Sequence, residues 1–168
     1  MPGWILAYIR IVDRLNTIIG RIVMYSLFLM VGILLWSSIS KTFFVPSLWT
    51  LESAQFALTA YYILGGAYAM QHGGHVRMDL FYAEWSDRTK AVIDAFTVLF
   101  LIFFLVVMLL GGINSTAYSL EYGERSATAW RPLMWPIKLI MCIGISLMLL
   151  QAVAEGLKDI ARVRKVAI

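Results

Sequence analysis

Charged residues are scarce in this sequence of 168 residues: Asp, Glu, Lys and Arg make up 14% of it, while hydrophobic residues make up 61%. An ordinary soluble domain is about 25% charged and about 45–50% apolar. A water-soluble fold of this length cannot bury so much apolar surface. The composition therefore excludes a disordered chain and a soluble enzyme, and it predicts an integral membrane protein.

Cysteine and histidine are nearly absent as well. The single cysteine, Cys142, cannot form an internal disulfide or a cysteine-based metal site, and it lies in an apolar run as a small packing residue. The only histidines are His72 and His75. Together with Asp79 they fall short of a zinc site, which needs at least three protein ligands in good geometry. No metal or cofactor is therefore expected on this chain.

Charge is missing almost entirely from four long apolar stretches, at 22–40, 53–72, 95–120 and 133–154. A spanning helix needs about 20 apolar residues, within a range of roughly 17–25. The sequence thus predicts an all-α protein with four transmembrane helices in a single membrane domain, 1–168. A cleaved signal peptide is the alternative for the first stretch, but its apolar run exceeds the usual length of about 7–15 residues, so we expect the helix to be retained.

Four spans put both termini on one side of the membrane, and the basic residues indicate which side. The loops and termini on that side carry Arg10, Arg14, Arg21, Arg77, Arg88, Lys90, Lys158, Arg162, Arg164 and Lys165. The other side carries only Lys41, Arg125, Arg131 and Lys138. By the positive-inside rule, both termini are predicted to be cytoplasmic. The formal net charge of +4 is thereby explained by topology, and no nucleic-acid partner is expected.

Two segments beside the spans have helical amphipathic patterns, at 4–19 and 78–94. Such helices lie in the membrane interface with their apolar face toward the acyl chains. Two other interpretations stay open. The first segment can extend the first span as a long tilted helix, and both segments can be ordinary helix ends shielded by lipid headgroups.

The spans contain no Asp, Glu, Lys or Arg at mid-bilayer depth. Ionisable groups at that depth mark ion paths, proton relays and substrate sites, so a proton-coupled antiporter is excluded. A haem-bearing bundle needs histidines facing one another within the spans, and a thiol-oxidising enzyme needs cysteine pairs. The chain is accordingly not expected to be an enzyme.

Two features predict contacts with other molecules. Gly65, Ala69 and Gly73 recur at every fourth residue, which lets another helix approach closely, either within this chain or from a partner. Trp130, Trp135 and Lys138 before the fourth span are residue types that anchor a protein at the membrane interface.

The four-span plan resembles one family. The residues that carry the resemblance are the stretch Gly73-Gly74-His75-Val76-Arg77-Met78-Asp79-Leu80 and the entry to the last span, Trp130-Arg131-Pro132-Leu133-Met134-Trp135-Pro136. Both are similar to the small membrane subunit (DctQ type) of tripartite ATP-independent periplasmic (TRAP) transporters. The similarity runs over roughly 18–157. Cys142 departs from it, since many relatives carry a proline two residues before the glycine that is Gly144 here.

The resemblance implies an accessory role. A large membrane subunit, expected at 1:1 with this chain, would carry the Na⁺ and substrate sites and move the substrate by an elevator-like motion. Both subunits would lie in a bacterial or archaeal inner membrane. A periplasmic binding protein would deliver an organic acid, and this chain would enlarge the static scaffold. His75, Arg77 and Asp79 are the matching motif positions, expected to order the turn after the second span. Residues expected either to dock the binding protein by charge or to form a solvated rim are Glu52, Glu121, Glu124, Arg125 and Arg131.

Two other functions stay open on the sequence: a membrane anchor for a respiratory or other enzyme complex, and a small self-contained carrier. Neither shows its signature, which would be redox ligands for the anchor and a polar interior for the carrier. The transported acid is not encoded in these residues, because the groups that choose it would lie on the partner proteins.

Overall fold

The computed structural model describes residues 3–72 and 87–163, and these residues form four long helices. The helices are α1 (Gly3–Phe43), α2 (Thr50–Gln71), α4 (Asp87–Glu121) and α5 (Trp135–Val163). The described residues contain no β-strand, only an isolated bridge between Arg125 and Leu133. The prediction of an all-α protein is confirmed.

Three helices in the described part of the chain are long and apolar enough to cross a membrane. They are α1, the Phe96–Glu121 part of α4 and the Trp135–Lys158 part of α5. The 22-residue α2 is about 33 Å long at 1.5 Å per residue, enough to span, but its sequence is less apolar. Its position explains the difference, because α2 lies between α1 and α5 and turns part of its surface toward protein. Three of the predicted spans thus stand as membrane-spanning candidates, and the fourth stays a prediction.

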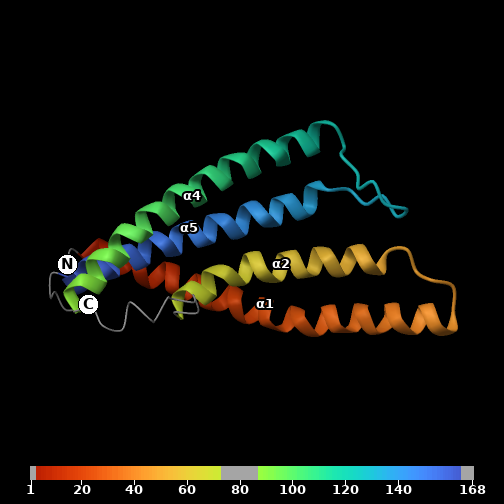
Figure 1. The fold of residues 1–168 in the computed structure, drawn as a ribbon, viewed down its shortest axis with the longest axis horizontal. Helices are drawn as coiled ribbons and strands as arrows, with labels where there is room; N and C mark the ends of the chain where they lie inside the picture. Colours follow the sequence, from red (N-terminus) through yellow and green to blue (C-terminus); the bar gives the residue numbers. More distant parts are fainter. Residues whose placement is uncertain (1–2, 73–86, 164–168) are drawn as a thin grey trace.

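The helices lie side by side in the order α1, α2, α5, α4 (Figure 1). Neighbours along the chain are antiparallel, while α2 and α5 run parallel, since Ile63 faces Gly144 and Gly66 faces Met148. The N-terminal half of α1 also contacts α5. Both described ends of the chain, at Gly3 and Val163, lie at one end of the molecule (Figure 1). We call this end the terminal end, and the end with the α1–α2 and α4–α5 loops the loop end.

The two predicted interfacial segments correspond to different parts of this structure. Residues 4–19 are continuous with the first span, as one 41-residue helix, α1. Residues 78–86 lie outside the described part, and 87–94 are the beginning of α4. The long extension of the first span is one of the interpretations that the sequence left open for the first segment.

Close helix contacts join α2 to its two neighbours. A Cβ added at Gly144 on α5 would lie 2.4 Å from the Ile63 side chain and 3.0 Å from its backbone carbonyl. A Cβ at Gly20 on α1 would lie 2.4 Å from the ring of Tyr68. Small residues at these positions therefore allow the backbones to approach, as in many membrane proteins. A cluster of Met70, Leu105, Ile145 and Ala152 continues the core from α2 across α5 to α4.

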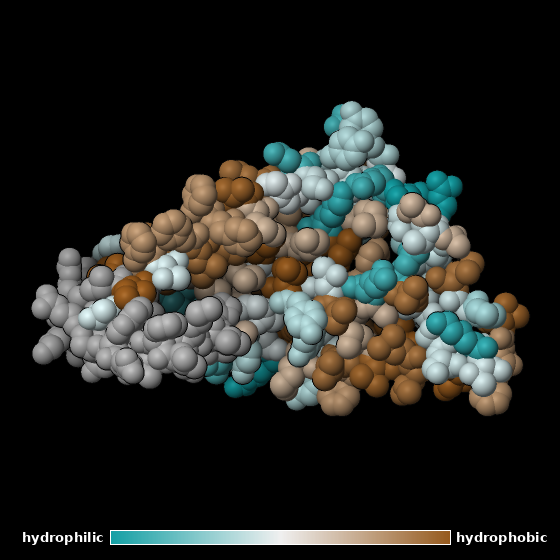
Figure 2. Space-filling model, in the orientation of Figure 1, coloured by the Kyte–Doolittle hydropathy of each residue, from teal (hydrophilic) through white to brown (hydrophobic). Residues whose placement is uncertain are grey.

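Apolar side chains cover much of the outside. Figure 2 shows hydrophobic residues over the outer part of α1 and over α4, with hydrophilic residues gathered near the α4–α5 loop. Phe28 on α1 is 71% exposed, and Phe103 on α4 is 69% exposed. Such surfaces suit acyl chains or the helices of another membrane protein.

Candidate functional site

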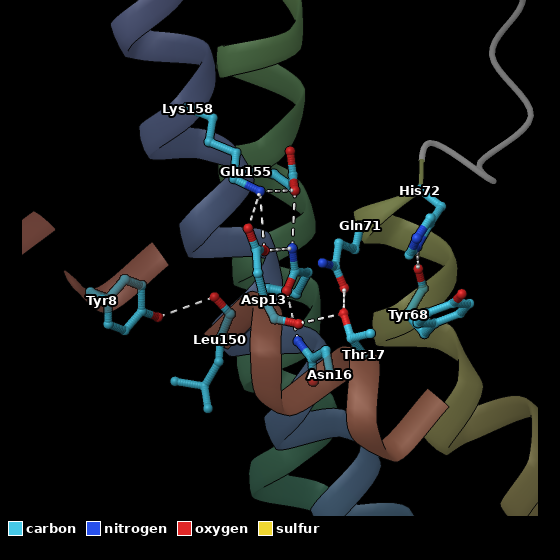
Figure 3. A network of polar contacts seen from close by, with 11 residues as sticks. Tyr8, Asp13, Asn16, Thr17, Tyr68, Gln71, His72, Leu150, Glu155 and Lys158 are labelled. Carbon is cyan, nitrogen blue, oxygen red and sulfur yellow. Dashed lines mark hydrogen bonds and ion pairs between the residues drawn. The ribbon is translucent and has the colours of Figure 1, made fainter. Parts of the chain in front are cut away.

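A network of polar side chains joins α1 to α5 near the terminal end (Figure 3). The Lys158 ammonium lies 2.9 Å from Oδ2 of Asp13 and 2.8 Å from Oε1 of Glu155. Gln151 donates from Nε2 to Oδ1 of Asp13 and to Oε1 of Glu155, both at 3.0 Å. Asn16 donates from Nδ2 to Oε1 of Gln151 at 2.7 Å. Two helices far apart in the chain are thus held by charge-assisted hydrogen bonds.

The centre of this network is fully enclosed. Gln151 is 0% exposed and Asn16 is 1% exposed. Hydrogen bonds are stronger in such surroundings than in water, and leaving a buried donor or acceptor unpaired is costly. Oδ1 of Asn16 has no hydrogen-bond partner within the described residues. The network therefore fixes how α1 sits on α5, because sliding one helix along the other would break several of these bonds at once.

Further hydrogen bonds extend the network to α2 and to the start of α1. The Thr17 hydroxyl lies 3.2 Å from Oε1 of Gln71 at the end of α2. The Tyr8 hydroxyl donates to the carbonyl of Leu150 on α5 at 3.1 Å. At the end of α2, the ring of His72 packs on the ring of Tyr68 with centroids 4.2 Å apart. Three helices consequently meet through polar contacts at the terminal end.

A second polar cluster orders the α4–α5 loop. Glu124 accepts a hydrogen bond from the Ser119 hydroxyl at 2.6 Å and forms an ion pair with Lys138 on α5. The hydrogen bond from Lys138, followed by that from Ser119, holds the pKa of Glu124 below its usual value. Backbone hydrogen bonds from Ser126 to Pro132 and from Met134 to Glu124 close the loop into a short hairpin. This loop is a defined surface at the loop end.

The five predicted docking residues all lie near the loop end, in different environments. Arg125, Arg131 and Glu121 are exposed, and Glu124 is paired with Lys138. Glu52, in the first turn of α2, is only 6% exposed, and its Oε2 has no hydrogen-bond partner in the described part of the chain. A partner protein can therefore reach the exposed arginines more readily than Glu52.

The remaining predicted residues are placed as follows. Gly65 is partly buried, and a Cβ there would lie 3.8 Å from Val23, in ordinary contact; Ala69 is also partly buried. Trp130 and Trp135 are exposed beside the loop. Lys138, predicted as an interface anchor, is paired with Glu124. The predicted positions outside the described residues are Gly73, His75, Arg77 and Asp79.

Sequence reasoning missed the network around Gln151. A signal was present, because Asn16 lies within the buried helical stripe of Ile9, Val12 and Gly20, which is the inward face of α1, and Asp13 lies beside that stripe. Polar residues on an inward face need partners. Within the described residues, no group of three or more His, Cys, Asp or Glu side chains could hold a metal ion.

The chain was compared with models of known protein families. A family model described as "Tripartite ATP-independent periplasmic transporters, DctQ component" matches residues 30–162. The match covers the last third of α1 and almost all that follows, including the α5 side of the polar network. The α1 side, with Asp13 and Asn16, precedes it. A search of curated proteins gives no match.

Proposed function

Because the chain belongs to the DctQ family, the small membrane component of TRAP transporters, we propose that it is an accessory subunit that binds the large membrane subunit and enlarges its static scaffold. In TRAP systems the DctQ component works with that large subunit and with a periplasmic binding protein. The family is a family of transporter components rather than enzymes. The observation that carries the proposal is the family match over most of the chain.

The interior of the chain supports a static role. An element that moves during transport needs two arrangements that differ little in free energy. Here α1 is fixed on α5 by the ion pair of Lys158 with Asp13 and by the enclosed amide of Gln151. The backbone of Ile63 lies against Gly144, so sliding α2 along α5 would bring bulkier side chains into that contact. These contacts favour one rigid arrangement.

The proposed topology has four spans, α2 included, with both termini in the cytoplasm of a bacterial or archaeal inner membrane. The α1–α2 and α4–α5 loops would then face the periplasm. There the exposed Arg125 and Arg131 would meet acidic groups on the binding protein. The basic residues near the termini support this orientation.

Transport chemistry is assigned to the partners. We place the Na⁺ sites and the organic-acid site on the large subunit and the capture of the acid on the binding protein, with no cofactor on this chain. The spans carry no charged side chain at mid-bilayer depth that would pair with an ion or a carboxylate.

Copurification tests the proposal. The chain is tagged at its C-terminus in its native membrane, extracted in mild detergent, and its stoichiometric partners are identified by mass spectrometry. One large polytopic membrane protein at 1:1 is the expected result. Recovery of the chain alone, or with cofactor-bearing soluble subunits, would contradict the proposal. The tag is moved to the N-terminus as a control for a masked C-terminus.

A further inference from the structure

Three arginines form a line along the N-terminal half of α1. Arg10, Arg14 and Arg21 are all exposed. At 3.6 residues per turn they lie within about 40° of one another around the helix axis. None of the three makes a hydrogen bond or ion pair with any residue that the structure describes. This arginine line therefore presents free guanidinium groups on one side of α1.

No acidic group on this half of α1 neutralises the line. Asp13 is the one acid between Gly3 and Arg21 in the sequence. It points to α5 instead, where it pairs with Lys158 at 2.9 Å and accepts a hydrogen bond from Gln151 at 3.0 Å. Asp13 is thus paired about a quarter turn away from the arginine line, on the side of the helix that faces α5, and none of the three arginines is its partner.

Apolar side chains lie directly beside the arginine line. Trp4 is 72% exposed, Ile11 is 64% exposed and Ile18 is 52% exposed. They are displaced from the arginines by about a quarter turn, on the surface turned away from α5. A row of arginines beside a row of Trp and Ile is the pattern of a helix that lies at the membrane surface, with cations at the headgroups and apolar groups below them.

The length of α1 places the arginine line near the lipid headgroups. From Arg21 to Lys41 the helix rises about 30 Å, which is the thickness of the hydrocarbon layer. Arg21 therefore marks one hydrocarbon boundary. Arg14 and Arg10 follow within about 10–17 Å along the helix. Tilting of the long α1 lowers both toward the headgroup layer, and their long side chains reach back to it.

We propose that the arginine line binds the phosphate groups of anionic phospholipids. A guanidinium matches a phosphate with two parallel hydrogen bonds, and each basic residue near an anionic surface adds to the attraction. An acidic segment of a partner protein would form ion pairs with the arginines equally well. The exposed side chains of Trp4, Ile11 and Ile18 beside them, however, need apolar surroundings along the same part of α1, and a bilayer provides both. The inference uses the chain alone and does not depend on the transporter assignment.

Lipid retention by the purified full-length chain tests this. The chain is reconstituted in an equimolar mixture of phosphatidylglycerol and phosphatidylcholine and extracted again, and the retained lipids are quantified by mass spectrometry. The wild type is expected to enrich phosphatidylglycerol. In the variant Arg10→Gln/Arg14→Gln/Arg21→Gln, the enrichment of phosphatidylglycerol is expected to fall about fivefold for each arginine removed. The matched control, Lys41→Gln/Arg125→Gln/Arg131→Gln, removes the same charge elsewhere and is expected to keep it.

Three results would overturn the proposal. The first is a triple arginine variant that enriches phosphatidylglycerol as the wild type does, and the second is a control variant that loses as much. The third is a wild type without enrichment, which would assign the line to a protein partner. The wild type also provides a test without substitutions: about 1 M NaCl shortens the Debye length to about 3 Å, and enrichment that survives it would contradict binding by charge.

Discussion

At the scale of single residues, the close contact between α2 and α5 depends on the absence of a side chain at Gly144. A Cβ at Gly144 would lie 3.0 Å from the backbone of Ile63, and backbone cannot move aside as a flexible side chain can. We expect Gly144→Ala to lower the free energy of unfolding in mild detergent by about 1–3 kcal/mol, as overpacking does.

The matched control for that substitution is Gly32→Ala on α1, where an added Cβ meets nothing within 4 Å. We expect this variant to be neutral or to gain up to about 1 kcal/mol from helix propensity. Equal effects of the two substitutions on unfolding would show that α2 and α5 are not in close contact.

Glu124 makes the stability of the α4–α5 loop depend on pH. Its pKa is lowered by hydrogen bonds from Lys138 and Ser119, so the folded loop favours the ionised carboxylate. This stabilisation is present above the unfolded pKa, about 4.3, and is lost as the pH falls through the lower folded pKa.

We therefore expect the wild type to melt at a higher temperature than Glu124→Gln at pH 7, with the difference constant down to about pH 5 and shrinking below about pH 4.3. Melting curves across this range measure it. A difference that persists undiminished well below pH 4 would contradict the role of the Glu124 charge.

At the scale of helices, the enclosed amide of Gln151 holds the first half of α1 in place. Gln151→Ala leaves the Nδ2 donor of Asn16 without its acceptor and removes a donor from Asp13. We expect a loss of about 1–3 kcal/mol in the free energy of unfolding and faster hydrogen exchange in residues 5–20. The exposed Gln55→Ala on α2 is the control and should change neither. Unchanged exchange in Gln151→Ala would refute the network's role.

The sequence predicts the helices well and their mutual contacts poorly. Long stretches nearly free of charge mark α1, α4 and α5 because the lipid selects apolar residues at every exposed position. The same logic is weaker for α2, where neighbours α1 and α5 replace lipid and permit Gly66 and Tyr68. Which helix faces Gly144 depends on distant residues such as Ile63, and no local pattern encodes that pairing.

In the candidate site, too, the sequence shows the residues but not the contacts between them. The charge of Lys158 and Asp13 is visible in the sequence, but their ion pair joins residues at opposite ends of the chain. The loop residues Glu124 and Lys138 were predicted as a docking residue and as an anchor, and the structure pairs them with each other. Sequence position indicates the end of the molecule where a side chain lies; packing decides its partner.

At the scale of the whole molecule, the row of helices suits a subunit that extends another membrane protein. Among the described residues, α4 has its main contacts with α5 and leaves its other sides covered by exposed apolar residues such as Phe103 and Phe104. A row exposes more apolar surface than a closed bundle would. Such surface is available to a large subunit, to lipid, or to both.

The central claim is that this chain stays rigid while its partner moves, and crosslinking tests it most directly. Val12 on α1 and Ala154 on α5 share one apolar cluster. In the assembled transporter, Val12→Cys/Ala154→Cys is introduced together with Cys142→Ala, and the two new cysteines are joined. Uptake of the proposed organic-acid substrate into proteoliposomes is measured before and after joining, with Val12→Cys alone as control. A static scaffold predicts the same uptake rate before and after joining. Uptake that stops on joining and returns on reduction would contradict the account.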